Sequence, residues 1–134
     1  MTTTTARIRQ ADETLIYTDS GTIPRFDPYN PDPSLYDSAE DYDTALQVHV
    51  ALTDLGAETY GAEFVPEDEF IDYTEQVIHD CYDVSGLTRA SEHFDPHRWP
   101  YCHITIDYEA AARDLRHDYT PVTIDGVDYL VREA

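Results

Sequence analysis

Hydrophobic and polar residues alternate with a period of two in the first half of the chain. Around a polar turn, this alternation predicts a hairpin over Arg7–Asp19. The clearest run extends from Ala45 to Leu52, and after a turn a second run covers Thr59 to Val65. These two runs predict an antiparallel pair of strands.

The segment from Ile23 to Asp43 interrupts this pattern with prolines among aspartates and tyrosines. Proline has no backbone N–H and a fixed φ, so neither a helix nor a central strand accommodates many of them. We expect an extended loop or arm here, in which Ser38–Asp41 begins a short helical turn. The prolines are Pro24, Pro28, Pro31 and Pro33.

A period of 3.6 residues follows and predicts a helix from Pro66 to about Val84. Proline suits the first helical position, and acids after it favour the positive end of the helix dipole. The helix ends at Ser85-Gly86, and Leu87–Pro100 predicts irregular structure. The apolar stripe of the predicted helix consists of Phe70, Tyr73, Val77, Ile78, Cys81 and Tyr82.

The C-terminal third predicts a strand, a helix and a hairpin. Alternation indicates a strand over Tyr101–Ile106, and a helix over Ile106–Tyr119 follows, with Asp107 as its N-terminal cap. Asp125-Gly126 is a strong signal for a two-residue hairpin turn. The strands beside this turn are Val122–Ile124 and Val127–Val131.

These elements predict an α+β fold of small antiparallel sheets with packed helices and a strand-helix-hairpin C-terminal unit. We expect two regions: a β-rich N-terminal region over 1–65, including the Pro/Asp-rich loop 23–43, and an α+β region over 66–134. Several tyrosines are expected to pack their rings in the core. They are Tyr73, Tyr82, Tyr108, Tyr119 and Tyr129.

The most unusual feature of the sequence is its large excess of acidic residues. The chain has 28 acidic residues against 8 basic ones, no lysine, and a formal net charge of -20. Hydrophobic residues make up 41% of it, which argues against a disordered acidic chain. The acids are spread along the chain, which suggests a negative surface on a folded body. Since duplex DNA carries one charge per about 1.7 Å of axis, twenty charges match about 34 Å of duplex.

Several classes of protein are disfavoured by the same sequence. No apolar run is long enough to span a bilayer, and we expect a cytoplasmic protein without membrane contact. Cys81 and Cys102 are too few for a disulfide scaffold, so we expect buried thiols. Direct nucleic-acid binding draws on lysine and arginine, which are scarce here. Glycine-rich phosphate loops are absent.

Enzymatic and metal sites receive little support. A zinc site would have to combine His93 and His97 with the pairs His79/Cys81 and Cys102/His103, but no recognised ligand spacing occurs. Cys102 and His103, as strand neighbours, point to opposite faces and cannot form a nucleophilic dyad alone. We therefore expect no enzyme activity, no metal and no cofactor.

The C-terminal helix carries a resemblance to a known family. Asp107-Tyr108-Glu109, Ala112-Arg113-Asp114-Leu115 and Asp118-Tyr119, followed by a hairpin, resemble the C-terminal part of the ArdA antirestriction proteins. The resemblance extends from Phe70 to Val131. It implies an acidic homodimer that imitates the phosphates of duplex DNA and occupies type I restriction-modification enzymes.

This resemblance and the helical spacing of the acids suggest where a partner would bind. Helical neighbours lie about 5–6 Å apart, so acids on one face form a ladder of negative charge. The resemblance favours Arg113 and Tyr119 in a homodimer interface, whereas the simpler interpretation pairs Arg113 with Glu109 within the helix. The candidate phosphate-mimicking acids are Glu67, Asp68, Glu69, Asp72, Glu75, Asp80, Asp83, Asp107, Glu109, Asp114 and Asp118.

Two rival functions use the same charge. One is an ordinary globular binding protein from a salt-loving organism, whose acidic coat maintains solubility. The other is a phage-type DNA mimic directed at a different DNA-binding protein, such as a nuclease or a repressor. Folding at low ionic strength separates the first rival, because a halophilic protein should lose structure there.

Overall fold

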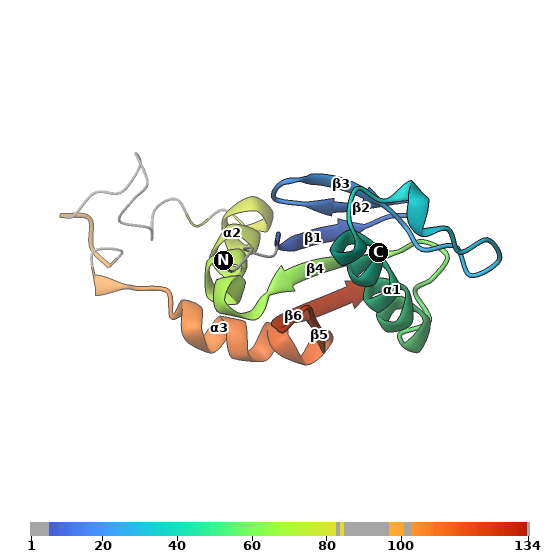
Figure 1. The fold of residues 1–134 in the computed structure, drawn as a ribbon. Helices are drawn as coiled ribbons and strands as arrows, with labels where there is room; N and C mark the ends of the chain where they lie inside the picture. Colours follow the sequence, from blue (N-terminus) through green and yellow to red (C-terminus); the bar gives the residue numbers. More distant parts are fainter. Residues whose placement is uncertain (1–5, 83, 85–96, 101–102, 134) are drawn as a thin grey trace. The chain divides into compact units, whose positions relative to one another are not determined.

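The computed structural model describes the chain except residues 1–5, 83, 85–96, 101–102 and 134. Contacts group it into a sheet unit, Met1–Glu67 with Asp118–Ala134, and a helix unit, Asp68–His117. The expected α+β class is confirmed (Figure 1). The elements are β1 (Ile8–Ala11), β2 (Leu15–Thr18), β3 (Gly21–Pro24), η1 (Pro33–Leu35), α1 (Ala39–Asp54), β4 (Ala62–Pro66), η2 (Glu67–Glu69), α2 (Phe70–Cys81), α3 (Tyr108–Leu115), η4 (Arg116–Asp118), β5 (Thr120–Ile124) and β6 (Val127–Glu133).

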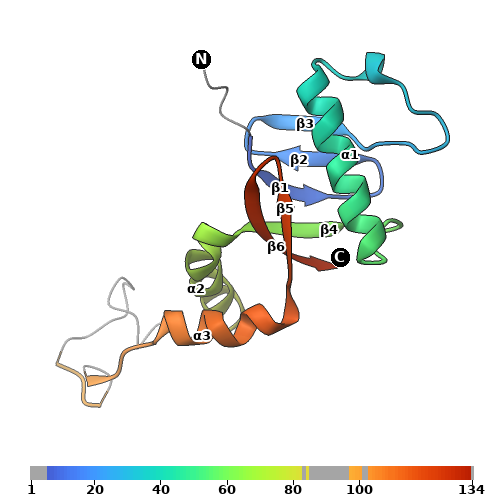
Figure 2. The same cartoon turned by 60° about the horizontal axis from the view of Figure 1, so that its bottom comes forward.

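One six-stranded sheet replaces the small separate sheets that we expected. Its strand order is β3-β2-β1-β4-β6-β5, and all of its neighbouring strands are antiparallel (Figure 2). The C-terminal hairpin joins the N-terminal strands because β4 pairs with both β1 and β6. The hairpin therefore belongs to the sheet unit, whereas our expected regions divided the chain at 65/66.

Both predicted hairpins form. Strands β1 and β2 occupy the span predicted over Arg7–Asp19, and β3 extends this hairpin into a meander. Asp125 and Gly126 join β5 to β6 with φ values of 53° and 79°, as a type I′ turn requires. The edge strand β3 was missed because Pro24 suggested a loop. Proline is tolerated on an edge strand, where a missing N–H breaks no ladder.

The predicted strand over Ala45–Leu52 is wrong, because these residues lie within α1. The hydroxyl of Ser38 accepts the N–H of Asp41 at 3.1 Å, which caps the helix where the short turn was expected. Ala45, Val48 and Leu52 are fully buried at helical spacing. The partner strand predicted over Thr59–Val65 exists as β4, but it pairs within the sheet.

Helix α1 covers a face of the sheet and packs against β3 and β5, the strands at its two edges (Figure 2). The core therefore lies between one helix and one sheet, and burial of its apolar side chains is the main favourable term for the sheet unit. Its buried members are Ile8, Ala11, Ile16, Ala45, Val48, Leu52, Ala57, Ala62, Phe64, Ile124, Tyr129 and Val131.

Close packing also fixes the backbone of Gly61, immediately before β4. Gly61 has a φ of 86°, and a Cβ atom placed on it would lie 1.8 Å from the carbonyl oxygen of Ala11. Only glycine tolerates both the positive φ and this close approach. The approach brings β4 against β1, its neighbour in the sheet.

The helix unit consists of α2 and α3, which pack against each other. Phe70, Thr74 and Ala112 are buried, and the side chain of Asp107 accepts the N–H of Ala110 at 3.0 Å, as predicted for the cap. Helix α3 ends at Leu115, with η4 in place of the last predicted turn.

Other expectations in this region are corrected. Helix α2 ends at Cys81, short of Val84, and Tyr82 is 67% exposed, so neither Cys81 nor Tyr82 lies in the core. Tyr82 lies beyond the end of the helix, and Cys81 is its exposed last residue. Residues 103–106 form no strand, and the remainder of that predicted strand lies outside the described residues. Cys102 and residues 87–96 also lie outside them.

The hydroxyl of Tyr129 ties β6 to β1 across the intervening strand β4. It accepts the backbone N–H of Ile8 at 3.1 Å, and both residues are 1% exposed. Burial raises the pKa of Tyr129, and the hydrogen bond from Ile8 opposes this effect. The buried N–H depends on this acceptor.

Replacing Tyr129 with phenylalanine should lower the free energy of unfolding by about 1–3 kcal/mol, because a buried N–H loses its partner. Urea denaturation measures this change. Tyr60→Phe is the matched control, since Tyr60 is 69% exposed. Equal stability of the two variants would contradict the assigned role.

Asp12 organises the turn between β1 and β2. Its carboxylate accepts the N–H of Leu15 at 2.7 Å and of Thr14 at 2.8 Å, and the hydroxyl of Tyr17 at 2.7 Å. These hydrogen bonds, chiefly from the Leu15 and Thr14 amides, lower the pKa of Asp12 below 3.8. The ionised carboxylate thus contributes stability above the ordinary aspartate pKa and loses it as the pH falls.

Asp12→Asn should therefore destabilise the protein at pH 7, and the difference from wild type should shrink below about pH 4. Thermal unfolding of both proteins over a pH series measures the difference. A gap that stays constant or widens in acid would show that the charge of Asp12 does not stabilise the turn.

Candidate partner-binding surface

The candidate acids of the helix unit lie on its surface. On α2 and the turn before it, Asp68, Asp72 and Glu75 follow three-and-four spacing; Asp68 and Asp72 are exposed, and Glu75 is half-buried. This spacing places them on one face of the helix. Asp80 is exposed farther along, and its carboxylate accepts the amide of Gln76 at 2.8 Å. Asp68, Asp72 and Glu75 thus keep the spacing that we predicted for the acids, across η2 and α2.

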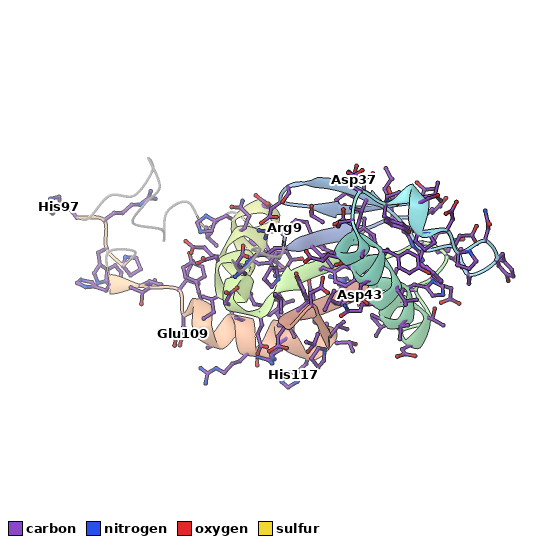
Figure 3. All side chains as sticks on the ribbon, in the orientation of Figure 1. Arg9, Asp37, Asp43, His97, Glu109 and His117 are labelled. Carbon is purple, nitrogen blue, oxygen red and sulfur yellow. The ribbon has the colours of Figure 1, made fainter. Side chains whose placement is uncertain are left out.

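Helix α3 exposes acids on more than one side. Glu109 and Asp114 are exposed, and Figure 3 shows the Glu109 side chain pointing away from the helix. Asp107 is also exposed, but its carboxylate serves as the N-terminal cap. It therefore combines a structural role with its charge.

The structure separates some of the remaining candidates. Glu67 and Asp118 belong to the sheet unit, whereas Glu69 lies at the start of the helix unit. Glu67 and Glu69 are half-buried, and Asp118 is exposed. Asp83 lies outside the described residues.

Arg113 and Tyr119 differ sharply in exposure. Arg113 is exposed, and within the described part of the chain no ion pair joins it to Glu109, so the intrahelical pairing that we considered is not formed. Tyr119 is only 7% exposed and packs within its own chain. Of the two residues expected at a dimer interface, Arg113 lies on the surface and Tyr119 exposes little of its side chain.

The side chain of His79, on α2, contacts Tyr108, on α3. Nε2 of His79 lies 2.9 Å from the hydroxyl of Tyr108, and the rings stack at 6.1 Å. Nε2 also lies 3.9 Å from the carboxylate of Glu75. In the described segments no group of three or more histidine, cysteine or acidic side chains has metal-binding geometry. No helix there is long and apolar enough to cross a membrane.

Sequence reasoning missed an acidic hollow in the sheet unit. It has a volume of about 650 Å³ and is lined by the start of α1, the β2–β3 turn and the β5–β6 turn. Figure 3 labels two of its acids, Asp37 and Asp43. The acid-rich sequence after Ser38 was visible, but without α1 it could not be placed beside Asp125. The acids that line it are Asp37, Glu40, Asp41, Asp43 and Asp125.

Gln47 holds two of these carboxylates together. Its amide nitrogen donates to Asp43 at 2.8 Å and to Asp125 at 2.7 Å, while its amide oxygen accepts the N–H of Asp125 at 2.9 Å. Thr44 also donates its hydroxyl to Asp125. These bonds attach the β5–β6 turn to α1 and fix an acid on the surface.

Comparison of the chain with protein-family models, curated proteins and solved structures finds no match. The functional argument therefore depends on the sequence and on the geometry described above.

Gln47→Ala should lower the free energy of unfolding by about 1–3 kcal/mol, because the N–H of Asp125 loses its acceptor and two carboxylates lose a shared donor. Gln76→Ala is the control, since Gln76 is also helical and bonds only an exposed acid; its effect should stay within about 0.5 kcal/mol. Chemical denaturation measures both. Similar losses in the two variants would refute the anchoring role of Gln47.

Proposed function

We propose that this protein is a non-enzymatic DNA mimic that occupies the DNA-binding channel of a type I restriction-modification enzyme. The observation that carries the proposal is a net charge of -20 combined with acids exposed on α2 and α3. The resemblance of the C-terminal helix to ArdA proteins supports the choice of target. No cofactor is required by such a mechanism.

The physical basis is electrostatic substitution. Carboxylates held on helices would meet the arginine and lysine side chains that normally contact DNA phosphates. Binding would release the ions that accompany both charged surfaces, so affinity would fall as salt rises. The opposite charge of protein and channel would also accelerate their encounter.

Position matters in this proposal as well as charge. Asp68 on η2 and Asp72 and Glu75 on α2 repeat at four and three residues and therefore stand as neighbours on one helical segment. A random acidic coat would attract the same enzyme, but it would not fix the spacing of its charges. Two variants with the same net charge can separate these possibilities.

In the first variant, Asp68, Asp72, Glu75, Asp114 and Asp118 become asparagine or glutamine. In the second, the same change is made at Asp27, Asp37, Glu40, Asp41 and Asp43. Exposed ion pairs contribute about 0.2–1 kcal/mol each, so loss of five should make the first variant inhibit DNA cleavage by the enzyme at least about fivefold more weakly than wild type. Its salt dependence should also be shallower.

The second variant is the control because it loses the same charge from another surface. It should lose less inhibition than the first. Equal losses would mean that net charge alone determines inhibition, and a larger loss in the second would move the binding surface to the acids of residues 27–43. Retention of structure at low salt, followed by circular dichroism, would exclude the salt-loving alternative.

A further inference from the structure

An apolar groove lies in the sheet unit, on a surface that otherwise carries many acids. It has a volume of about 520 Å³ and runs between α1 and the edge strand β5. Leu46, Val50 and Leu55 line it from the helix, and Pro121 and Val122 line it from the strand. The groove is distinct from the acidic hollow, with which it shares none of these residues.

On the helix side of this groove, Leu55 packs against the core, but Val50 does not. Val50 is 51% exposed, whereas Val48, two residues earlier, is fully buried. A β-branched residue on an exposed helical position has lower helix propensity than glutamate or lysine. Val50 gains little from folding of the monomer, and contiguous exposed apolar surface commonly marks a binding site.

The edge strand restricts the kind of occupant. Pro121 has no N–H, and the register from the β5–β6 turn places residues 121 and 123 at positions whose backbone groups face away from β6. The outer edge of β5 therefore lacks a donor where a new strand would need one. An occupant would use side chains, as an amphipathic helix does when it lies in a groove.

The negative charge around the groove favours a helix that carries basic side chains. Asp54 lines the groove, and the exposed Asp128 accepts the hydroxyl of the lining residue Thr123 at 2.7 Å. The lining of the groove contains neither arginine nor histidine. In this groove an acid-rich helix of a second copy would be repelled by these carboxylates, whereas a helix with basic flanks would be attracted.

We propose that this groove binds an amphipathic helix of the partner protein, with apolar side chains against Val50 and arginine or lysine side chains near Asp54 and Asp128. The inference depends on the proposed function for the identity of the partner. This apolar contact is one that DNA itself cannot make. It would add to the electrostatic attraction with which the protein competes with DNA.

The test compares two single substitutions that add the same negative charge at exposed apolar helix positions. Val50→Glu blocks the groove, and Ile71→Glu, at a residue 46% exposed on α2, is the control. Circular dichroism should show both variants folded. The probe is a labelled peptide of leucine, alanine and arginine whose leucines repeat at i, i+3, i+4 and i+7, against a scrambled peptide of identical composition.

Wild type and Ile71→Glu should bind the amphipathic peptide at least about tenfold more tightly than the scrambled one, and Val50→Glu should lose this preference. Equal binding of the two peptides by wild type, or equal loss in both variants, would overturn the groove as a helix site. Self-association that Val50→Glu abolishes would make a second copy the occupant and would also overturn it.

Enzyme inhibition then tests the partner. Pure electrostatics predicts that both variants inhibit as well as wild type or better, because each gains a negative charge. The proposal predicts that Val50→Glu inhibits several-fold more weakly than Ile71→Glu. Equal inhibition would refute the enzyme as the source of the helix. If wild type fails to inhibit the enzyme but still prefers the amphipathic peptide, the proposed function is wrong, and the assignment of the groove as a helix-binding site is retained.

Discussion

Repulsion among carboxylates opposes the folded state of this chain. In a chain with a net charge of -20, repulsion at the surface opposes folding, so the core and specific hydrogen bonds must offset it. In the sheet unit, α1 spans the sheet from one edge strand to the other and buries Val48 and Leu52. Tyr129 and Gln47 then tie distant segments together through hydrogen bonds.

Local signals in the sequence were sufficient for the hairpins and for the C-terminal helices. Asp125-Gly126 specifies its turn by backbone conformation, and Asp107 specifies its helix start by a side-chain bond, so both predictions depend on neighbours alone. The assignment of α1 failed because Leu46, Val48, Val50 and Leu52 alternate by chance. Helical burial instead follows Ala45, Val48 and Leu52, and the cap at Ser38 favours it. The pairing of β4 with β6 joins residues far apart in the chain, and no local pattern contains that information.

The candidate surface was predictable to a similar extent. Helical spacing correctly indicated that Asp68, in η2, and Asp72, in α2, would be exposed. The acidic hollow and the apolar groove were not predictable, because each combines α1 with a strand or turn from another part of the chain. Both depend on recognising α1 as a helix, and an error in one element therefore concealed two surface features.

The account requires that the protein and DNA compete for one surface of the enzyme. The most direct measurement is equilibrium displacement of labelled duplex DNA from a type I restriction-modification enzyme by the wild-type protein, over a salt series. Complete displacement, with an apparent affinity that weakens steadily as salt rises, is the predicted result. A stable ternary complex of enzyme, DNA and protein, or no displacement at any salt concentration, would contradict the account.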